Sequence, residues 1–304
     1  MRIVLIGQAA FGAKVFETLT EKQEHIIAVY TPADQQSGRF DPLKQAAIEK
    51  GIQVIQPKTY KDDIVFSEYQ ALKPDLTVMA FVTDIISERF FKVPTKGAIN
   101  YHPSLLPRHR GASAINWAII MGDTKTGLSI FWPDGGIDTG PLLLQKEIYI
   151  KPEDTTGTLY FNHLFPMGVE AIMESIELIK KGKAPEIRQD ESLATYEPPC
   201  DDRNANIDWQ KPAKELYNLI RGCDPQPGAY VVHKGEKLRF YEPKLILEPS
   251  EQPVGTVLQI DDQGIHVAIP DAKLILSKVK SSGKKLHGAE FATQQGVKIG
   301  DILG

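Results

Sequence analysis

Short apolar runs alternate with amphipathic segments through the first hundred residues of the chain. The first run, Ile3–Ile6, ends at Gly7 and is followed by a predicted helix over Phe11–Leu19. Uninterrupted apolar runs of this length are typical of strands buried on both faces of a parallel sheet. The same rhythm predicts strands at Ile26–Tyr30, Gln53–Ile55, Leu76–Phe81 and Gly97–Asn100, and a helix at Gln45–Lys50. Such alternation predicts an α/β domain with a doubly wound, Rossmann-like sheet.

Two more strands and a long helix complete this predicted domain. The strands Leu128–Trp132 and Leu142–Glu147 flank a glycine-rich loop. A single helix over Thr155–Lys181 is expected, because a threonine can cap its start and Gly182 follows its end.

A segment rich in proline and charge separates this pattern from a second, shorter-strand pattern. We predict one domain over residues 1–182, a linker over 183–205 and a second domain over 206–304. The second domain carries five short predicted strands, at Tyr230–His233, Leu238–Tyr241, Gly255–Ile260, Ile265–Ile269 and Lys273–Val279. Short strands separated by turns predict a small β-rich domain, most simply an OB-like β-barrel.

Composition and charge exclude several classes of protein. A chain of 304 residues can bury two cores, and its net charge of −4 gives no reason to expect DNA or another polyanion as a partner. Only Cys200 and Cys223 are present, without the spacing of a zinc site or a disulfide framework. We therefore expect a cytoplasmic protein. The first apolar run is too short for a signal peptide or a membrane span.

Three side chains suited to acyl transfer lie near predicted strand ends. Asn100 and His102 are two residues apart, so on an extended segment they point to the same side. Asp138 lies in the glycine-rich loop Asp134–Gly140, which can bring a carboxylate against the imidazole. An amide can donate to a developing oxyanion, an imidazole can move a proton near neutral pH, and a carboxylate can orient the ring. Ligands of α/β sheets bind beyond the carboxyl ends of the strands, where these residues are predicted.

The segment YHPSLLPRHRGASAINW, Tyr101–Trp117, and the later Asp138-Thr139-Gly140 resemble the 10-formyltetrahydrofolate-dependent formyltransferase family. The run is most similar to the hydrolase domain of 10-formyltetrahydrofolate dehydrogenase, and it also resembles methionyl-tRNA formyltransferase. The resemblance extends over nearly the whole chain. It implies a formyltransferase catalytic domain over 1–182 and an enzyme that transfers a formyl group from 10-formyltetrahydrofolate to water or an amine.

The resemblance also implies roles for individual residues. Asn100 and His102 would hydrogen-bond the tetrahedral oxyanion, and Asp138 would orient His102 and help to accept a proton. The formyl donor is a substrate, and neither a metal nor NAD is expected. The residues implied to line the folate pocket are Met79, Phe81, Val82, Thr83, Ser104, Leu105, Leu106, Pro107, Asp134, Gly135 and Gly136.

The acceptor stays open at this stage among water, an amino sugar, a carrier-bound amino acid and an aminoacyl-tRNA. The loop Pro32–Lys44 lacks the basic insertion through which tRNA formyltransferases grip their acceptor, and the chain is acidic overall. Both features favour water or a small acceptor. Asn100, which the transferases carry, and the ending Ser282–Gly304, which is similar to the tRNA enzymes, favour an amine. The chain ends without the aldehyde dehydrogenase module, so we do not expect it to oxidise the formyl group.

Three other features carry competing interpretations. The turn Gly7–Gly12 lacks the central glycine of a dinucleotide fingerprint, so we predict a tight turn there. The segment Arg108–Arg110 is either a clamp for substrate charge or an anchor for the preceding turn. The basic run Lys278–Lys285 is either a solvated hairpin or a phosphate-contacting loop. A folate-binding module without catalysis is the alternative of another class, and the complete amide, imidazole and carboxylate set argues against it.

Overall fold

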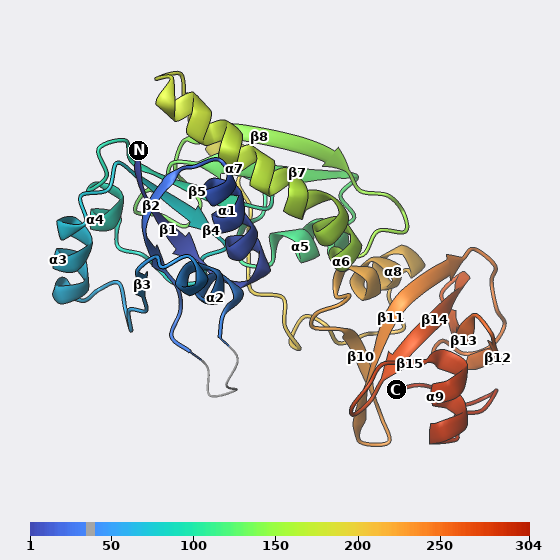
Figure 1. Ribbon diagram of the computed structural model, residues 1–304. Coiled ribbons are helices and arrows are strands. Elements are labelled where there is room, and N and C mark those ends of the chain that lie inside the picture. Colours follow the sequence, from blue (N-terminus) through green and yellow to red (C-terminus); the bar gives the residue numbers. More distant parts are fainter. Residues whose placement is uncertain (35–39) are drawn as a thin grey trace. The chain divides into compact units, whose positions relative to one another are not determined.

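The chain forms two compact units in a computed structural model that describes residues 1–34 and 40–304 (Figure 1). The first unit contains Met1–Arg110, Gly127–Glu147 and His163–Tyr196, and the second contains Gly111–Thr126, Ile148–Asn162 and Glu197–Gly304. The part of the Pro32–Lys44 loop at positions 35–39 lies outside the described residues.

A seven-stranded sheet with the order β3-β2-β1-β4-β5-β7-β8 organises the first unit. The pairs among β1 to β5 are parallel, whereas β7 runs antiparallel to β5. The predicted doubly wound α/β sheet is therefore confirmed, with a mixed edge. The strands are β1 (Arg2–Gly7), β2 (His25–Tyr30), β3 (Val54–Ile55), β4 (Leu76–Ala80), β5 (Ala98–His102), β7 (Lys125–Phe131) and β8 (Leu142–Tyr149).

Helices cover both faces of this sheet. One face packs against α1 and α7 in a core that includes Leu5, Phe11 and Ile172, and Figure 1 shows these two helices side by side. The other face forms a second core around Tyr69 and Phe90 from α3 and α4. The helices of this unit are α1 (Ala9–Glu21), α2 (Pro42–Glu49), α3 (Asp63–Ala71), α4 (Glu88–Phe91) and α7 (Phe165–Lys180), with a 3₁₀ turn at Glu191–Leu193.

The prediction of a single long helix over Thr155–Lys181 is wrong, because the helix is interrupted. The chain forms α6 (Thr156–Leu159), a π-helical turn over Tyr160–Leu164, and then α7. Pro166 explains the wide turn, because proline has no backbone N–H and its ring crowds the carbonyl four residues earlier in a regular α-helix. The predicted start is confirmed, since Thr155 and Thr158 form a reciprocal capping box.

The second unit is built on an antiparallel sheet with the order β10-β11-β14-β13-β12, and β15 pairs with β14. Trp209, Phe240 and Phe291 lie in its core. This confirms the predicted β-rich domain. The strands are β10 (Ala229–His233), β11 (Glu236–Ile246), β12 (Val257–Asp261), β13 (Gly264–Ile269), β14 (Ala272–Lys280) and β15 (Leu286–His287). The remaining elements are the helices α5 (Ala114–Ile120), α8 (Ala213–Gly222) and α9 (Gly288–Gln295) and the short paired strands β6 (Arg110–Gly111) and β9 (Tyr196–Glu197).

Within the described ranges, no helix combines the length and the apolar character needed to cross a membrane.

Candidate active site

Strand β5 places the first two candidate residues at the carboxyl end of the parallel sheet. Asn100 pairs with Met79 of β4 on one side and with Phe131 of β7 on the other, so its backbone is held by two neighbouring strands. His102 is two residues further and pairs with Ser129. Because side chains alternate along a strand, Asn100 and His102 share a face, with their Cα atoms about 7 Å apart.

The imidazole of His102 is buried between two acceptors. Its Nε2 lies 2.7 Å from the carbonyl oxygen of His109, and its Nδ1 lies 3.5 Å from Oδ2 of Asp138. A carbonyl oxygen can only accept a hydrogen bond, so Nε2 carries a proton. A proton that the ring gains or loses therefore enters or leaves at Nδ1, beside the carboxylate.

Asp138 reaches His102 from the loop between β7 and β8. Its φ of +56° lies in the left-handed region, which Asp tolerates better than most residues. The loop is closed by Asp134, whose Oδ1 accepts hydrogen bonds from Gly136 N at 3.0 Å and Thr139 Oγ1 at 2.5 Å. A Cβ atom at Gly140 would lie 1.7 Å from the carbonyl oxygen of Trp132. The glycine is therefore required by close packing of the loop.

Asn100 offers an open hydrogen-bonding group. Its Oδ1 is buried and has no hydrogen-bond partner among the described residues. A buried acceptor left unsatisfied costs about 1–3 kcal/mol, so native proteins usually give it a partner from the protein, an ordered water or a ligand. The amide of Asn100 is thus available to a ligand donor.

The Ser104–Pro107 segment is held by its own hydrogen bonds. The hydroxyl of Ser104 donates to the carbonyl oxygen of Arg108 at 2.7 Å. The backbone N–H of Leu106 donates to Ser129 Oγ at 3.1 Å, and its carbonyl accepts from Gln145 Nε2 at 2.9 Å. Leu105 is half-buried and Pro107 is buried. The Ser104 hydroxyl therefore stabilises a turn, in keeping with the absence of a nucleophile elbow around it.

The chain that follows β4 is more open. Met79 is buried, Val82 is half-buried, and the ring of Phe81 is 45% exposed with a φ of +63°. Thr83 is exposed, and its hydroxyl accepts a hydrogen bond from Gln8 Nε2 at 3.0 Å. The exposed Gly135 lies near Glu88 of α4, because a Cβ atom there would be 3.3 Å from Glu88 Oε2. This edge of the sheet thus combines an exposed aromatic ring with polar groups.

The segment Arg108–Arg110 serves as an anchor at two of its three positions. Arg110 has no exposed surface, and its guanidinium donates to Gln189, Glu191 and Tyr196. The hydrogen bond with Glu191 raises the pKa of Arg110 above its usual value. His109 is buried as well, whereas Arg108 is exposed. A clamp for substrate charge is thus left to Arg108 alone.

No pattern in the sequence indicates the residues that hold this anchor. Gln189 and Thr195 lie within the predicted linker 183–205, yet Gln189 is only 5% exposed. Neither residue belongs to a motif or a recognisable spacing. The contacts that they make join positions about eighty residues apart, such as the 79 residues between Arg110 and Gln189.

The turn Gly7–Gly12 is tight, as its residues predict. A Cβ atom at Gly7 would lie 2.3 Å from the carbonyl oxygen of Ala80. The carboxylate of Asp41 accepts a hydrogen bond from Ala9 N at 2.7 Å, at the start of α1. A negative side chain therefore already occupies this helix terminus. That no nicotinamide nucleotide binds here stays a prediction.

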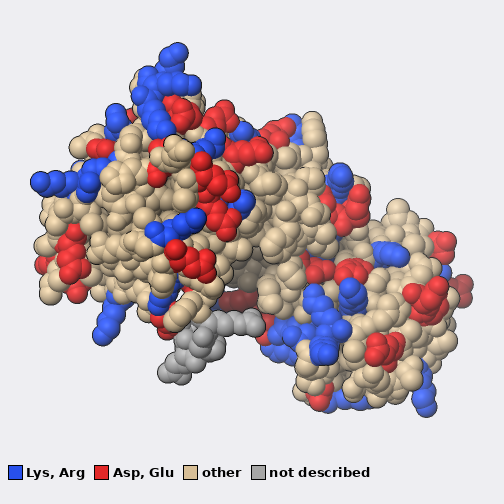
Figure 2. Space-filling view, in the orientation of Figure 1, with Lys and Arg blue, Asp and Glu red and all other residues tan. Residues whose placement is uncertain are grey.

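The basic run Lys278–Lys285 is partly neutralised. Lys278 Nζ lies 2.7 Å from Glu242, and Lys285 Nζ lies 3.5 Å from Asp224. Neither Lys280 nor Lys284 has an ion-pair partner among the residues that the structure describes. Figure 2 shows acidic and basic side chains intermingled on the visible surface, with a group of basic ones over the second unit near β10.

Arg221 of α8 has a structural role. Arg221 is buried and donates to Asn218 Oδ1 and to the carbonyl oxygen of Asp154, and burial lowers its pKa. Over residues 1–34 and 40–304, no group of three or more His, Cys, Asp or Glu side chains is arranged to hold a metal ion.

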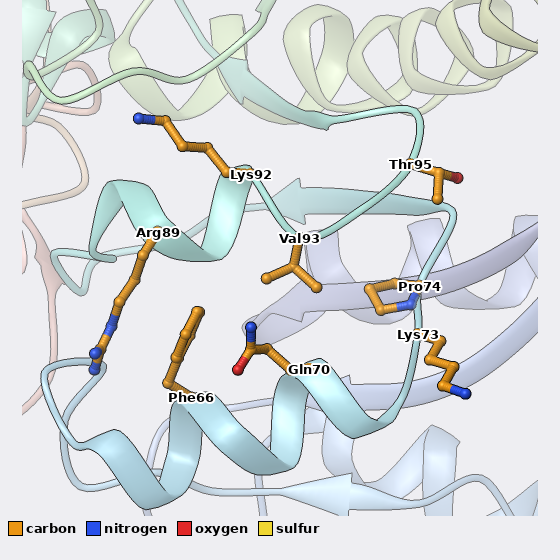
Figure 3. Close-up of a pocket in the computed structure, with 8 residues that line it drawn as sticks. All are labelled: Phe66, Gln70, Lys73, Pro74, Arg89, Lys92, Val93 and Thr95. Atoms are coloured by element: carbon orange, nitrogen blue, oxygen red, sulfur yellow. The ribbon is translucent and has the colours of Figure 1, made fainter.

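A groove of about 680 Å³ lies between α3 and α4 and the loops that follow them (Figure 3). Its lining includes Lys73 and Pro74, which precede β4, and Thr95, which precedes β5. Two of its cations are already paired, Arg89 with Asp63 and Lys92 with Glu88. None of the candidate site residues lines this groove.

Comparison with known proteins identifies the family. Residues 1–175 match the family described as formyl transferase, and residues 200–296 match the formyl transferase C-terminal domain. The chain belongs to the formyl transferase family. This confirms the family that the SLLP segment and the Asp-Thr-Gly element indicated, and it makes the chain a member of an enzyme family.

Several relatives of this formyl transferase have names that state their activity. This chain is 43% identical over 263 residues to the mitochondrial 10-formyltetrahydrofolate dehydrogenase of Mus musculus. The aligned region covers 84% of this chain and 28% of the relative. The chain is 38% identical to the cytosolic enzyme of Homo sapiens, over 98% of this chain and 36% of that protein. The chain thus spans about a third of the length of these dehydrogenases. The methionyl-tRNA formyltransferase of Caldanaerobacter subterraneus is 36% identical over the full length of both chains.

Solved structures share the fold of this formyl transferase. HypX from Aquifex aeolicus in complex with tetrahydrofolic acid superposes with a TM-score of 0.72 at 19% identity, over 98% of this chain and 48% of HypX. An N-formyltransferase from Helicobacter canadensis, in complex with folinic acid and dTDP-3-aminofucose, gives a TM-score of 0.70 at 19% identity, over 93% of this chain and 100% of that one. At such identities the likeness shows the fold alone.

Proposed function

We propose that this formyl transferase moves the formyl group of 10-formyltetrahydrofolate to an amine or to water and releases tetrahydrofolate. The observation that carries the proposal is the grouping of Asn100, His102 and Asp138 at one end of the sheet. An amide with an open, buried oxygen lies on the same strand face as an imidazole whose Nδ1 lies 3.5 Å from a carboxylate. The names of the relatives supply the formyl donor.

In this proposal the folate binds along the open edge of the sheet. The pterin lies against Met79–Asp84 and the loop 134–138, and the folate tail passes the segment Ser104–Pro107. The exposed ring of Phe81 supports this placement, because flat heterocycles bind well against aromatic side chains. The formyl carbon then lies near Asn100 and His102.

The proposed reaction is an addition followed by an elimination. The amine nitrogen or water oxygen attacks the formyl carbon, and the electron pair of the C=O bond moves to its oxygen. The Nδ2 group of Asn100 donates a hydrogen bond to that oxyanion, and so does the Nδ1–H of His102 when both ring nitrogens carry a proton, while Oδ1 of Asn100 accepts one from the nucleophile. Asp138 takes up the proton that the nucleophile loses. The oxyanion then re-forms the C=O bond, the bond between carbon and N10 breaks, and N10 takes the proton that Asp138 holds. Tetrahydrofolate leaves with the formylated amine or with formate.

The proposal allows several classes of formyl acceptor. The full-length match to a methionyl-tRNA formyltransferase and the unpaired Lys280 and Lys284 support an aminoacyl-tRNA. The higher identity to the dehydrogenases supports water. An amino sugar or a carrier-bound amino acid fits the same chemistry. A cytoplasmic location, away from DNA and membranes, is proposed on the two free thiols Cys200 and Cys223.

The experiment that tests the function measures release of tetrahydrofolate from 10-formyltetrahydrofolate by the purified chain. It is run without acceptor, with methionyl-tRNA, with an amino sugar nucleotide and with a carrier-bound amino acid, and His102→Ala serves as the blank. Release in buffer alone identifies a hydrolase, and release only with one acceptor identifies that acceptor. Tight folate binding without release under any of these conditions contradicts the proposal and favours a folate-binding module.

A further inference from the structure

The segment Gln189–Tyr196, here called the strap, contacts the loop that carries Asp138. The side-chain amide of Gln189 donates to the carbonyl oxygen of Asp138 at 2.8 Å and to that of Gly140 at 2.7 Å. Both hydrogen bonds are formed by Nε2, which has two N–H groups to give. The strap thereby holds the left-handed backbone of Asp138 through its carbonyl group.

The other end of the strap contacts the segment that faces the opposite side of the His102 ring. The backbone N–H of His109 donates to Thr195 Oγ1 at 2.8 Å, and the N–H of Arg110 donates to the Thr195 carbonyl at 3.0 Å. The N–H of Thr195 in turn donates to the carbonyl of Pro107 at 3.2 Å. The carbonyl of His109 that receives the Nε2–H of His102 is therefore fixed from the strap.

Arg110 joins the two ends and determines which way the amide of Gln189 points. Its Nε and one terminal nitrogen lie 3.2 and 2.8 Å from Oε1 of Gln189, and its terminal nitrogens also bind both carboxylate oxygens of Glu191. A guanidinium can only donate, so the atom of Gln189 that faces it must be the oxygen. The amide nitrogen then has to face the carbonyls of Asp138 and Gly140.

We infer that Gln189 is a positioning residue for the His102–Asp138 pair, and that the strap sets both hydrogen-bonding partners of the His102 ring. Gln189 holds the carboxylate partner at Nδ1, and Thr195 holds the carbonyl partner at Nε2. The inference rests on the proposed function, because it assigns Gln189 and Thr195 to the same reaction. It adds two residues from a segment whose sequence predicts only a linker.

Three variants and one control test the inference. Gln189→Glu keeps an oxygen for Arg110 and removes both N–H donors, so it separates the positioning contact from the anchor. Gln189→Met removes both contacts at similar size. Thr195→Val removes only the hydroxyl that accepts from His109. Ser192→Ala is the control within the strap, since the backbone N–H and the hydroxyl of Ser192 both donate to Asp190 Oδ1, away from the candidate site.

We expect Gln189→Glu and Gln189→Met to lower kcat for formyl release by about 10- to 100-fold, the range seen when the partners that orient metal-binding side chains are removed. The KM for 10-formyltetrahydrofolate should change by less than about threefold, because Gln189 contacts the backbone of the Asp138 loop and is not proposed to contact the folate. The pH profile of kcat should change shape, and ¹⁵N NMR signals of the His102 ring should move. Thr195→Val should shift the Nε2 signal, and Ser192→Ala should match the parent protein.

Two results would overturn the inference. One is a folded Gln189→Glu protein with the parent kcat, pH profile and His102 NMR signals. The other is a loss of activity that appears only as a higher KM. The NMR measurement needs no turnover, so it separates this inference from the proposed function. If the parent protein transfers no formyl group but the His102 signals still move in Gln189→Glu, the positioning stands and the proposed function fails.

Discussion

Nδ1 of His102 lies 3.5 Å from Oδ2 of Asp138, and both side chains are largely buried. Nε2 of His102 donates a hydrogen bond to the carbonyl oxygen of His109, so Nδ1 is the nitrogen of this ring that can exchange a proton. We expect Asp138→Asn to lower kcat by about 10³- to 10⁴-fold, as loss of the orienting carboxylate does in other imidazole-based sites. Formyl release under saturating donor measures it. An activity within threefold of the parent would contradict a role for the carboxylate.

Asn100 should contribute to the transition state more than to binding. Removing one oxyanion donor costs about 2.7–4 kcal/mol of transition-state stabilisation, or roughly 10²–10³ in kcat. Asn100→Ala should therefore lower kcat by this factor with a small change in KM. Asn100→Asp, similar in size, should be at least as inactive, because a carboxylate repels a developing oxyanion. A higher KM for the donor with an unchanged kcat would assign Asn100 to folate binding instead.

Gly140 should tolerate no side chain. A Cβ atom there would lie 1.7 Å from the carbonyl oxygen of Trp132, so Gly140→Ala must displace the loop that carries Asp138. We expect a lower thermal midpoint together with a large loss of kcat. Gly182→Ala is the matched control, because a Cβ atom there meets nothing within 4 Å and only its φ of +62° is unfavourable, at about 1 kcal/mol. Similar behaviour of the two variants would show that the close contact does not matter.

Asp202 should make the stability of the second unit depend on pH in the acid range. Hydrogen bonds from Arg239 and Lys237 lower the pKa of Asp202 to about 2. Since the folded-state pKa is depressed, the stabilisation is present above the ordinary value near 3.8 and is lost as pH falls from there to about 2. The Asp202 side chain is 41% exposed, so the effect is at most about 1 kcal/mol.

Urea unfolding of the parent protein and of Asp202→Asn measures this contribution. The difference in the free energy of unfolding should be largest near neutral pH, should shrink toward pH 2 and should fall in 1 M salt, which screens exposed ion pairs. A difference that stays constant with pH would mean that the ion pairs do not stabilise the fold.

The two thiols should differ in reactivity. Sγ of Cys200 lies 3.9 Å from Sγ of Cys223. The hydrogen bond from Cys223 lowers the pKa of the half-buried Cys200, whereas the same contact, together with burial, raises the pKa of Cys223. Because the thiolate is the nucleophile, iodoacetamide should modify Cys200 first, and Cys223→Ala should slow that reaction. Peptide mass spectrometry follows both sites. Equal rates of modification, or a faster Cys223, would contradict this assignment.

Local pattern was sufficient for the strands and for part of the candidate site. The apolar run that ends at Asn100 predicts a buried strand, and the two-residue spacing to His102 places both side chains on one face, since strand geometry repeats every two residues. The glycines around Asp138 indicated a tight loop for a similar local reason. The prediction of one continuous helix over Thr155–Lys181 is wrong, because Pro166 replaces one regular turn by a wider π-helical turn.

The sequence alone determined the α/β sheet, the β-rich second unit, the family and the residue types of the candidate site. The tertiary structure alone decided that Asp138 meets Nδ1 of His102, that the His109 carbonyl holds Nε2, and that Gln189 braces the loop. The physical reason is the range of the interactions. Periodicity records how each residue meets its near neighbours and the core, whereas hydrogen bonds between groups 79 or 86 residues apart leave no regular trace along the chain.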